Sequence, residues 1–210
     1  MAEKKKILYI VEAMGGGVFT YIVDLANELV NSYDMYIAYA VRKQTPENYK
    51  DYFDKRIHLI EVENFARAIN PSKDIAAFFE IRKIAKRVRP DIIHLHSSKA
   101  GALGRLAFNG KKVPVFYTPH GYSFLMQNSS STKRKIYKAI ETICGKRNCT
   151  TISCSAGEHE ESEKLTKQAV YVNNAVNTEA LQELIEAVPR KKHPFTVFTL
   201  GRICYQKNPK

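Results

Sequence analysis

The sequence predicts an α/β protein in which helices cover both faces of an open, doubly wound parallel sheet. Short apolar runs that are typical of buried strands alternate along the chain with segments of helical periodicity. Two of these runs, Lys6–Val11 and Phe195–Leu200, each lead into a loop that contains glycine. A length of 210 residues leaves room for one large domain and the beginning of another.

The first third of the chain predicts three strands and a helix. Lys6–Val11 is almost continuously apolar, as a parallel strand buried on both faces requires. Val18–Val30 repeats apolar residues at the spacing of a helix. Met35–Val41 and Ile57–Val62 are short runs rich in residues that favour strands, so we expect two further strands there.

The middle of the chain predicts two helices and two strands. Asn70-Pro71 combines a helix-capping side chain with a first-turn proline, and Pro90 ends the helix that follows. The inward face of that helix is expected to carry Ile75, Phe78, Ile81, Ala85 and Val88. Asp91–His96 and Val113–Thr118 are strand-like, and Ala100–Phe108 is a helix of small residues closed by a glycine.

The last third continues the alternation. A helix follows the polar loop Gln127–Thr132, with Ile136, Ile140, Ile143 and Cys144 expected to face inward. Ser155 and Glu158 form a capping box, in which the serine bonds forward and the glutamate bonds back, so a helix begins there. The remaining expected elements are the strands Thr150–Ser153 and Val170–Val172, the helix Thr178–Val188 and a basic linker over Pro189–Pro194.

Charge and composition narrow the classes of function. Lys and Arg number 33 against 21 Asp and Glu, and this net charge of +12 favours a phosphorylated substrate, a lipid surface or nucleic acid. Nucleic acid is disfavoured because the chain has no recognition-helix motif and no aromatic residues interleaved with its basic runs. No apolar run approaches the roughly 18 residues that cross a bilayer, and no cleavable leader is visible, so we expect a cytoplasmic protein.

The cysteines predict neither a disulfide framework nor a metal centre. Cys144, Cys149 and Cys154 are evenly spaced and lack the Cys-x-x-Cys pair that is typical of zinc sites. We expect them to pack as small apolar residues in a reducing compartment.

Doubly wound sheets bind ligands beyond the carboxyl ends of their strands, and this rule selects the candidate site residues. Gly15-Gly16-Gly17 stands between the first strand and the first helix, where glycines let a phosphate approach the helix N-terminus. The dinucleotide fingerprint is incomplete, because Thr20 replaces its last glycine and no acid ends the second strand. A nicotinamide cofactor is therefore not expected, and a merely flexible turn is the alternative.

Histidines and hydroxyls mark the end of another strand. His94 and His96 lie two residues apart, hence on one face of the strand. Because no third ligand is evident nearby, we interpret them as buried, hydrogen-bonded side chains rather than metal ligands. Ser97, Ser98 and Lys99 follow at the carboxyl end and are placed to bind polar or anionic groups.

The sharpest internal motif is Thr118-Pro119-His120-Gly121. A strand stops at a proline and presents His120, and the glycine gives the imidazole room. A structural histidine is the alternative interpretation, but the position at the end of a strand favours a functional one.

A cationic cluster occupies the expected start of a helix. Lys133-Arg134-Lys135 and Lys138 lie where the helix dipole opposes positive charge, so they have a better claim to a functional cause than the basic residues over 82–89, which suit a helix C-terminus. A solvated helix face is the equal alternative for each cluster. Phe124-Leu125-Met126 precedes the cluster. Apolar residues beside cations can seat a protein on an anionic membrane, and packing of the three apolar residues under the loop is the equal alternative.

These motifs occur in the order that is typical of one protein family. The matching segments are 15–19, 91–101, 118–121, 152–155, 172–177, 200–202 and 207–209. Taken together they resemble the retaining glycosyltransferase family 4, whose members have the two-domain GT-B architecture. The most similar-looking members act in capsular or other surface polysaccharide assembly.

The resemblance implies transfer of a sugar from a nucleotide diphosphate sugar, with retention at the anomeric carbon. Gly16 and Gly17 would lie against the donor diphosphate, and His120 would contact the donor sugar as the catalytic-site histidine. Arg202 and Lys207 match the basic pair that stabilises the departing phosphate. Two fixed cations supply that charge, so neither a metal ion nor another cofactor is expected.

The resemblance also implies a domain division. Residues 1–190 would form the Rossmann-like, acceptor-binding N-terminal half of a GT-B fold, and we assign Ser97, Ser98 and Lys99 to the saccharide or lipid-linked acceptor. Residues 191–210 would be a linker and the first part of the nucleotide-sugar-binding domain.

Three departures from the family pattern limit the expected activity. The Glu-x7-Glu motif of the second domain is absent, and Ala175 and Cys204 stand where the family has other residues. Because the second domain with its Glu-x7-Glu motif is missing, we expect little or no transfer from these residues alone. From the charge pattern we expect a cytoplasmic protein that sits peripherally on the inner face of the membrane. A non-catalytic scaffold or regulatory protein that keeps this fold is the alternative.

Overall fold

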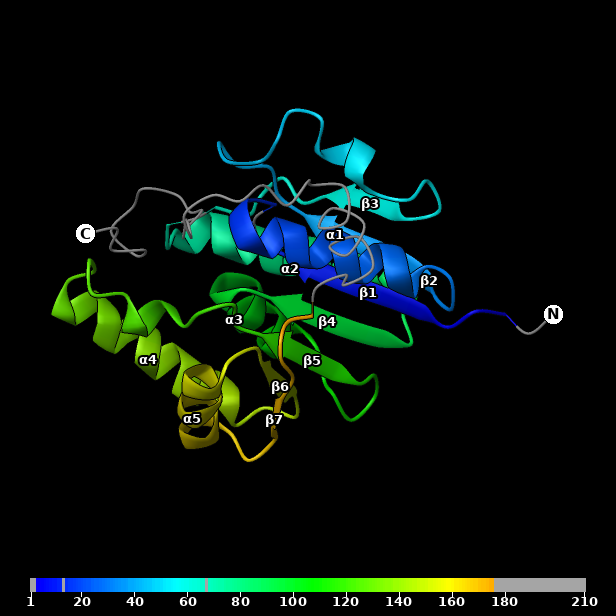
Figure 1. Cartoon of the computed structure of the whole chain (residues 1–210). Helices are drawn as coiled ribbons and strands as arrows, with labels where there is room; N and C mark the ends of the chain where they lie inside the picture. The colour runs from blue at the N-terminus through cyan, green and yellow to red at the C-terminus, as the bar shows by residue number, and fades with distance from the viewer. Residues whose placement is uncertain (1–2, 13, 67, 176–210) are drawn as a thin grey trace, which may run out of the picture.

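The computed structural model describes residues 3–12, 14–66 and 68–175, and within them it forms a seven-stranded sheet (Figure 1). The strand order is β3-β2-β1-β4-β5-β6-β7, and every adjacent pair is parallel. The order reverses its direction between β1 and β4, which confirms the predicted doubly wound, Rossmann-like architecture. The elements expected at Thr178–Val188, Pro189–Pro194 and Phe195–Leu200 lie outside the described residues.

The strands occur where the apolar runs predicted them. They are β1 (Lys6–Val11), β2 (Asp34–Tyr39), β3 (His58–Glu61), β4 (Ile92–His96), β5 (Val115–Thr118), β6 (Thr150–Ser153) and β7 (Ala169–Tyr171). The bounds of β1 and β6 agree with the prediction, and the other strands shift by one or two residues at an end. The register aligns Ile10 of β1 with Ala38 on one side and Leu95 on the other, so β1 is an interior strand next to the central strand β4.

Five helices and two 3₁₀ turns connect the strands within the described part of the chain. They are α1 (Gly16–Leu29), α2 (Pro71–Val88), α3 (Ser98–Ala107), α4 (Ser131–Gly145) and α5 (Ala156–Leu165), with η1 (Tyr49–Tyr52) and η2 (Ser123–Leu125). The Asn70 carboxamide accepts from Lys73 N at 3.2 Å, which is the predicted N-cap of α2. None of these five helices combines the length and the apolarity needed to cross a membrane.

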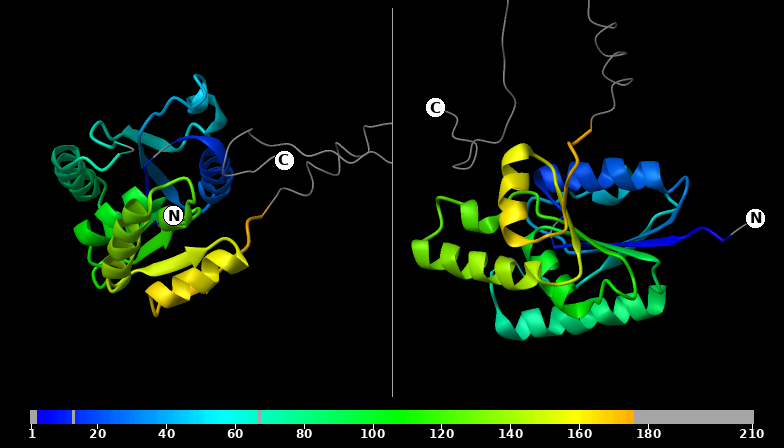
Figure 2. Two further views of the ribbon diagram at one scale, coloured as in Figure 1. Left: turned by 90° about the vertical axis from the view of Figure 1, so that its left-hand side faces the viewer. Right: turned by 90° about the horizontal axis from the view of Figure 1, so that it is seen from below.

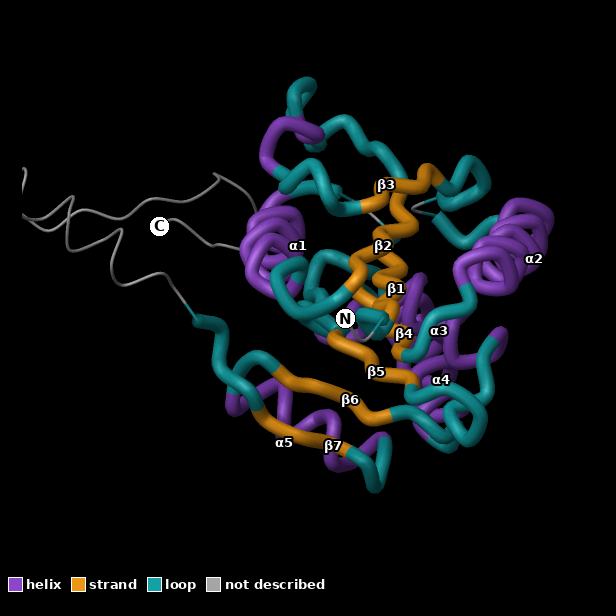
Figure 3. Tube along the Cα trace, turned by 90° about the vertical axis from the view of Figure 1, so that its right-hand side faces the viewer, coloured by secondary structure: helices purple, strands orange, loops and turns teal. Residues whose placement is uncertain are grey.

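Helices cover both faces of the sheet, as Figures 2 and 3 show for α1 and α2 on opposite sides. Alternate residues of β1 point to opposite faces: Tyr9 and Val11 pack with α1, whereas Leu8 and Ile10 pack with α2 and α3. Helices α4 and α5 add side chains to the same cluster as α2 and α3. Loops at the carboxyl ends of the strands are thereby left between two helical layers.

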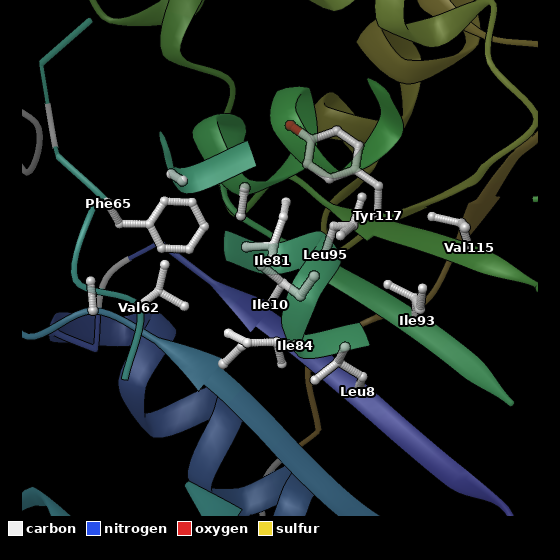
Figure 4. Close-up of a cluster of buried hydrophobic side chains, with 14 of the residues drawn as sticks. Leu8, Ile10, Val62, Phe65, Ile81, Ile84, Ile93, Leu95, Val115 and Tyr117 are labelled. Carbon is white, nitrogen blue, oxygen red and sulfur yellow. The ribbon is translucent and has the colours of Figure 1, made fainter. Parts of the chain in front are cut away.

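The core between the sheet and α3 depends on close approach of the backbone (Figure 4). A Cβ at Gly101 would lie 2.2 Å from the Tyr117 ring, and one at Gly104 would lie 2.3 Å from the Leu95 side chain. Only glycine fits at either position, because real Cβ atoms do not approach that closely. The predicted small-residue helix therefore packs directly on β4 and β5.

The predicted inward face of α2 is wrong in part. Ile75 is 59% exposed, and the buried residues are Ala77, Ile81, Ile84 and Val88. The buried stripe thus begins at Ala77, about half a turn later than the apolar periodicity indicated, and Phe78 and Ala85 are half-buried.

The predicted inward face of α4 is wrong for Ile136 and Ile143, whereas Ile140 is half-buried and Cys144 is buried as predicted. Ile136 is 46% exposed and Ile143 is 62% exposed, whereas Glu141 and Cys144 are the buried residues of this helix. Glu141 accepts from Arg105 Nη2 at 2.6 Å and from the Tyr117 hydroxyl at 2.9 Å. A buried ion pair therefore fastens α4 to the core together with the apolar side chains of Tyr137 and Cys144.

Candidate functional site

The carboxyl ends of β1, β4 and β5 bring the glycine turn and the histidines to one edge of the sheet. The link between them is Tyr21, which lies one turn into α1. Its ring centroid is 4.8 Å from that of His120 and 6.0 Å from that of His96. The glycine turn and His120 therefore flank the same space rather than opposite rims of the sheet.

The glycine turn leaves the N-terminus of α1 open. Gly15 caps the helix without a side-chain hydrogen bond, and no acidic residue lies in the first turn. Gly16 has a φ of 60°, a conformation that favours glycine. A Cβ added at Gly17 would meet no atom within 4 Å, so the protein's own packing does not require this glycine. First-turn N–H groups have no partner within their own helix, and together with the helix dipole and the open side of Gly17 they suit an anionic group such as phosphate.

Three histidines form a chain beneath this space. His94 Nε2 lies 2.8 Å from the Thr118 hydroxyl, and His96 Nδ1 lies 3.1 Å from His120 Nε2. His94 is 7% exposed and His96 is fully buried, which confirms the expected buried, hydrogen-bonded pair.

Burial controls the protonation of all three imidazoles. Loss of hydration lowers the pKa of His94 to about 3, with a smaller effect of the nearby His120. The same cause lowers the pKa of His96 well below its usual value and that of His120 to about 4. At neutral pH the chain of histidines is uncharged, so it acts through hydrogen bonds rather than through positive charge.

The loop that presents His120 is held in an unusual conformation. His120 has a φ of 54° and Gly121 a φ of 93°. Glu158, which is 8% exposed, accepts from Gly121 N at 2.6 Å and from Cys154 N at 2.8 Å, one bond to each carboxylate oxygen. A left-handed backbone at a non-glycine residue costs about 1–3 kcal/mol and is found where function demands it.

The predicted capping box of α5 is half correct. Ser155 Oγ accepts from Glu158 N at 3.3 Å, as a capping serine should. The Glu158 carboxylate does not return to Ser155 N; it bonds Cys154 N, one residue earlier, and reaches across to Gly121. The glutamate is therefore shared between the helix start and the His120 loop.

The residues assigned to the acceptor lie at the end of β4, and two of them are already bonded. Lys99 Nζ donates to Asp74 at 2.7 Å and to Ala68 O at 2.5 Å, which ties α3 to α2. The Ser98 hydroxyl accepts from Ser123 at 3.1 Å. Ser97 has a φ of 74° and donates its backbone N–H to Thr118 O at 3.0 Å. The Lys99 ammonium is therefore occupied by Asp74 and not presented as a separate cation.

Sequence reasoning missed Tyr21, Glu158 and an ion pair at the same edge. Arg42, which follows β2, pairs with Glu12, which follows β1, and both side chains are mostly buried. The adjacent strand ends were a usable signal for this pair. Nothing in the sequence pointed to Tyr21 or to the role of Glu158, because Tyr21 meets His120, and Glu158 meets Gly121, from a distant segment of the chain.

Charge also gathers on the outer side of α4. Lys133, Arg134, Lys135 and Lys138 are exposed in its first turns, with Ile136 among them. Leu125 of the preceding η2 turn is 47% exposed, whereas Phe124 is 4% exposed and packs in the core. The packing interpretation of the Phe124–Met126 segment is thus confirmed for Phe124, Leu125 is exposed, and the membrane interpretation stays a prediction.

The described residues offer no arrangement that resembles a metal centre. Among them no group of three or more His, Cys, Asp and Glu side chains is placed to hold a metal ion. Cys144 and Cys149 are buried and Cys154 is partly buried, all three with free thiols, as expected of packing residues. Arg202 and Lys207 lie outside the described residues.

Comparisons with known proteins agree with one another. Residues 15–180 match the family described as Glycosyltransferase Family 4. The chain is 33% identical over 182 residues to the UDP-Gal:alpha-D-GlcNAc-diphosphoundecaprenol alpha-1,3-galactosyltransferase of Escherichia coli, covering 76% of this chain and 44% of the relative. It is 31% identical over 216 residues to an uncharacterized 41.2 kDa protein in the cps region of Klebsiella pneumoniae, covering 96% of this chain and 56% of the relative. The chain thus spans about half the length of the curated relatives it matches.

Solved structures share the fold. Sucrose-phosphate synthase from Thermosynechococcus elongatus superposes with a TM-score of 0.61 at 15% identity, over 89% of this chain and 53% of that one. The lipopolysaccharide outer core galactosyltransferase WaaB gives a TM-score of 0.55 at 17% identity, over 81% and 46%. Anabaena HepE, solved with UDP and glucose, gives 0.59 at 14% identity, over 87% and 50%.

Proposed function

This chain belongs to glycosyltransferase family 4, and on that premise we propose that it forms the acceptor-binding half of a retaining enzyme. The reaction is transfer of a sugar from a nucleotide diphosphate sugar to a saccharide or lipid-linked saccharide of surface polysaccharide assembly. One observation above all supports the proposal: the open N-terminus of α1 and His120 flank the same space. On this proposal, the helix N-terminus binds the anionic diphosphate, and the neutral His120 side forms hydrogen bonds to the sugar. The two sides therefore match the two parts of a sugar diphosphate.

The proposed roles follow from the geometry. The backbone N–H groups at Gly16 and Gly17 hold the donor diphosphate, because nothing in the first turn of α1 competes for them. His120 contacts a hydroxyl of the donor sugar as a neutral imidazole. Ser97 and Ser98, at the end of the neighbouring strand β4, contact the acceptor, while Lys99 supports them through its bond to Asp74.

We propose that charge on the leaving diphosphate is stabilised by Arg202 and Lys207 and that no metal ion takes part. Fixed cations lower the barrier where negative charge develops, without reorganising at the moment of reaction. Two such residues together with the N-terminus of α1 suffice for a diphosphate. Because the chain spans about half of its relatives, we also propose that these 210 residues alone transfer little or no sugar.

The test is a transfer assay with the complete gene product and with the 210-residue chain. UDP-galactose and a GlcNAc-diphospholipid are the first substrates to use, since the name of the E. coli relative specifies them. We expect transfer with retained anomeric configuration from the complete gene product and little or none from the 210-residue chain. A folded gene product that transfers from no nucleotide sugar would instead support the scaffold alternative.

We further propose that the outer side of α4 holds the protein on the anionic inner face of a membrane. Four cations and the exposed Ile136 and Leu125 share this region, and the only acid of α4, Glu141, is buried against Arg105. Each cation near an anionic surface contributes about 1 kcal/mol, and the apolar side chains enter the headgroup region. A lipid-linked acceptor would then reach the carboxyl edge of the sheet from that surface.

Sedimentation with vesicles tests the membrane proposal. Wild-type chain should pellet with vesicles of anionic lipid and stay in solution with neutral ones. Charge reversal at Lys133, Lys135 and Lys138 should abolish pelleting, whereas reversal of Lys83, Lys86 and Arg87 on α2 is the matched control. Equal pelleting of wild type with both lipids would contradict the proposal.

A further inference from the structure

The chain of histidines contains one buried nitrogen that has no partner among the described residues. His96 is fully buried, and its Nδ1 lies 3.1 Å from His120 Nε2, but its Nε2 makes no hydrogen bond. The His96 ring centroid lies 4.0 Å from that of His94, 4.8 Å from that of Tyr9 and 6.0 Å from that of Tyr21. The buried imidazole is therefore packed among aromatic rings, and among the described residues none offers its Nε2 a hydrogen bond.

Only two arrangements of protons are compatible with this geometry. Both imidazoles are neutral at pH 7, so one of the two facing nitrogens carries a proton and the other a lone pair. If His120 Nε2 donated, the His96 proton would sit on the unpartnered Nε2 as a buried N–H without an acceptor. If His96 Nδ1 donates, the unpartnered Nε2 is a lone pair, and no buried donor is left over.

The second arrangement has the lower energy. Buried N–H groups without an acceptor are rare in proteins, and under-satisfied acceptors are less so. A donor held against tyrosine rings would lose its hydration with no compensation. His96 Nδ1 is thus the donor, and His120 Nε2 is the acceptor.

We infer that His96 is a positioning residue that fixes the proton of His120 on Nδ1, so that His120 offers the ligand an N–H donor and not a basic lone pair. The hydrogen bond at one imidazole nitrogen determines the protonation of the other. The inference rests on the proposed function, because it specifies how His120 would meet a sugar: by donating to an oxygen. It excludes His120 as the base that removes a proton from the acceptor.

The backbone geometry supports a fixed rather than a rotating imidazole. Glu158 holds the loop from one side through Gly121 N, while His96 and Tyr21 contact the His120 ring from the other. The His96 and His120 rings lie 5.4 Å apart and 25° from parallel. A ring flip of His120 would break its hydrogen bond to His96. Both nitrogens of that bond, His96 Nδ1 and His120 Nε2, would then be unpaired.

Imidazole nitrogen NMR on the 210-residue chain tests the inference without any assay of activity. Chain labelled with ¹⁵N-histidine is recorded at pH 7.5, and the His120 signals are identified by their loss in His120→Gln. We expect a protonated Nδ1 and an unprotonated Nε2 for His120, and the same for His96. A proton on His120 Nε2 would overturn the inference.

Three variants separate the hydrogen bond from mere packing. An Asn side chain places its amide N–H₂ where His Nδ1 stands, so His96→Asn should keep the Nδ1–H form of His120. His96→Leu removes the donor and should release His120 to a mixture of the two forms. His94→Asn, on the same strand and bonded to Thr118, is the matched control and should leave His120 unchanged. An unchanged His120 in the Leu variant would overturn the inference.

Kinetics of the complete gene product provide the second readout. The Leu variant should lower kcat/KM on the order of 10- to 100-fold through loss of donor orientation, and the Asn variant should recover most of it. If the complete gene product transfers no sugar at all, the proposed function fails while the tautomer result still stands. If transfer is normal in the Leu variant, His96 does not act on the reaction through His120.

Discussion

At the carboxyl edge of the sheet, polar side chains are buried and bonded to one another, whereas on the outer side of α4 apolar side chains are exposed. The first region contains the histidine chain and Glu158, and within it Nε2 of His96 lacks a partner among the described residues. The second contains Ile136 and Ile143, at 46% and 62% exposure. The first region therefore buries polar side chains that bond to one another, and the second leaves apolar side chains in contact with solvent.

The difference between the two regions lies in what holds them in place. At the carboxyl edge several features fix the position of His120. Its backbone has a positive φ, Glu158 holds the next residue, Gly121, and the His96 ring stacks on the imidazole. Helix α4 is held on its inner side by the Glu141–Arg105 ion pair, by buried Cys144 and by Tyr137, which packs against the core, and most of its other residues are exposed. Rigid placement suits a group that must orient a substrate, and an open amphipathic face suits a surface without fixed geometry.

The largest expected effect lies in the attachment of α4. Glu141→Gln leaves the Arg105 guanidinium, 3% exposed, without its counter-charge, and should lower the free energy of unfolding by about 3 kcal/mol. Urea unfolding measures this value. In Arg105→Met combined with Glu141→Leu no buried charge remains, so the double variant should lose less than either single one. A larger loss in the double variant would show that packing, not the ion pair, holds α4.

The next effect concerns the His120 loop. Glu158→Gln replaces one accepting oxygen with an N–H₂ group that cannot accept from Gly121 or Cys154, so we expect a loss of about 2 kcal/mol in unfolding free energy. Glu160→Gln, at an exposed position of the same helix, is the control and should change it by less than about 0.5 kcal/mol. Equal effects of the two substitutions would mean that the carboxylate does not hold the loop.

A pH effect of about 1–2 kcal/mol per buried histidine should follow from the histidine chain. The pKa of His120 falls from 6.5 to about 4 on folding and that of His94 to about 3, so the unfolded chain binds more protons between these values and pH 6.5. Stability is therefore full above pH 6.5 and declines as the pH falls toward 4. Urea midpoints at pH 7 and pH 5 check this. His94→Asn should reduce the loss of unfolding free energy between pH 7 and pH 5. His58→Asn, at an exposed site, is the control and should leave that loss unchanged.

The smallest effect belongs to the exposed isoleucines of α4. Ile136→Ser and Ile143→Ser should each change the unfolding free energy by no more than about 0.5 kcal/mol, because these side chains bury little surface. Thermal or urea unfolding of the isolated chain measures it. A loss of 2 kcal/mol or more at either position would mean that the isoleucines pack inward, as their spacing in the sequence indicates.

The sequence predicted the sheet well because its central strands are nearly continuous apolar runs, and only a buried parallel strand requires such a run. It predicted the edge that holds Gly16 and His120 because parallel strands place all their carboxyl ends together. The prediction of the buried face of α4 failed, because apolar spacing shows which residues share one side of a helix but not which side faces the core. The side that faces the core carries Glu141, whose partner Arg105 is 36 residues away in the chain.

The side-chain contacts inside the candidate site could not be predicted from the sequence for the same reason, because the residues in contact are far apart along the chain. Tyr21 of α1 contacts the His120 ring and Glu158 of α5 holds Gly121, at separations in the sequence that no local pattern records. Lys99 looked available because its partner Asp74 belongs to a helix whose position relative to α3 only the fold reveals.

The most direct measurement compares sugar transfer by the complete gene product with that by its His120→Ala variant, using UDP-galactose and the GlcNAc-diphospholipid. If His120 and the N-terminus of α1 form one wall of the donor cleft, kcat/KM should fall on the order of 100-fold, with unchanged activity in His58→Ala. Equal kcat/KM in His120→Ala and wild type would contradict the assignment of this edge as the site.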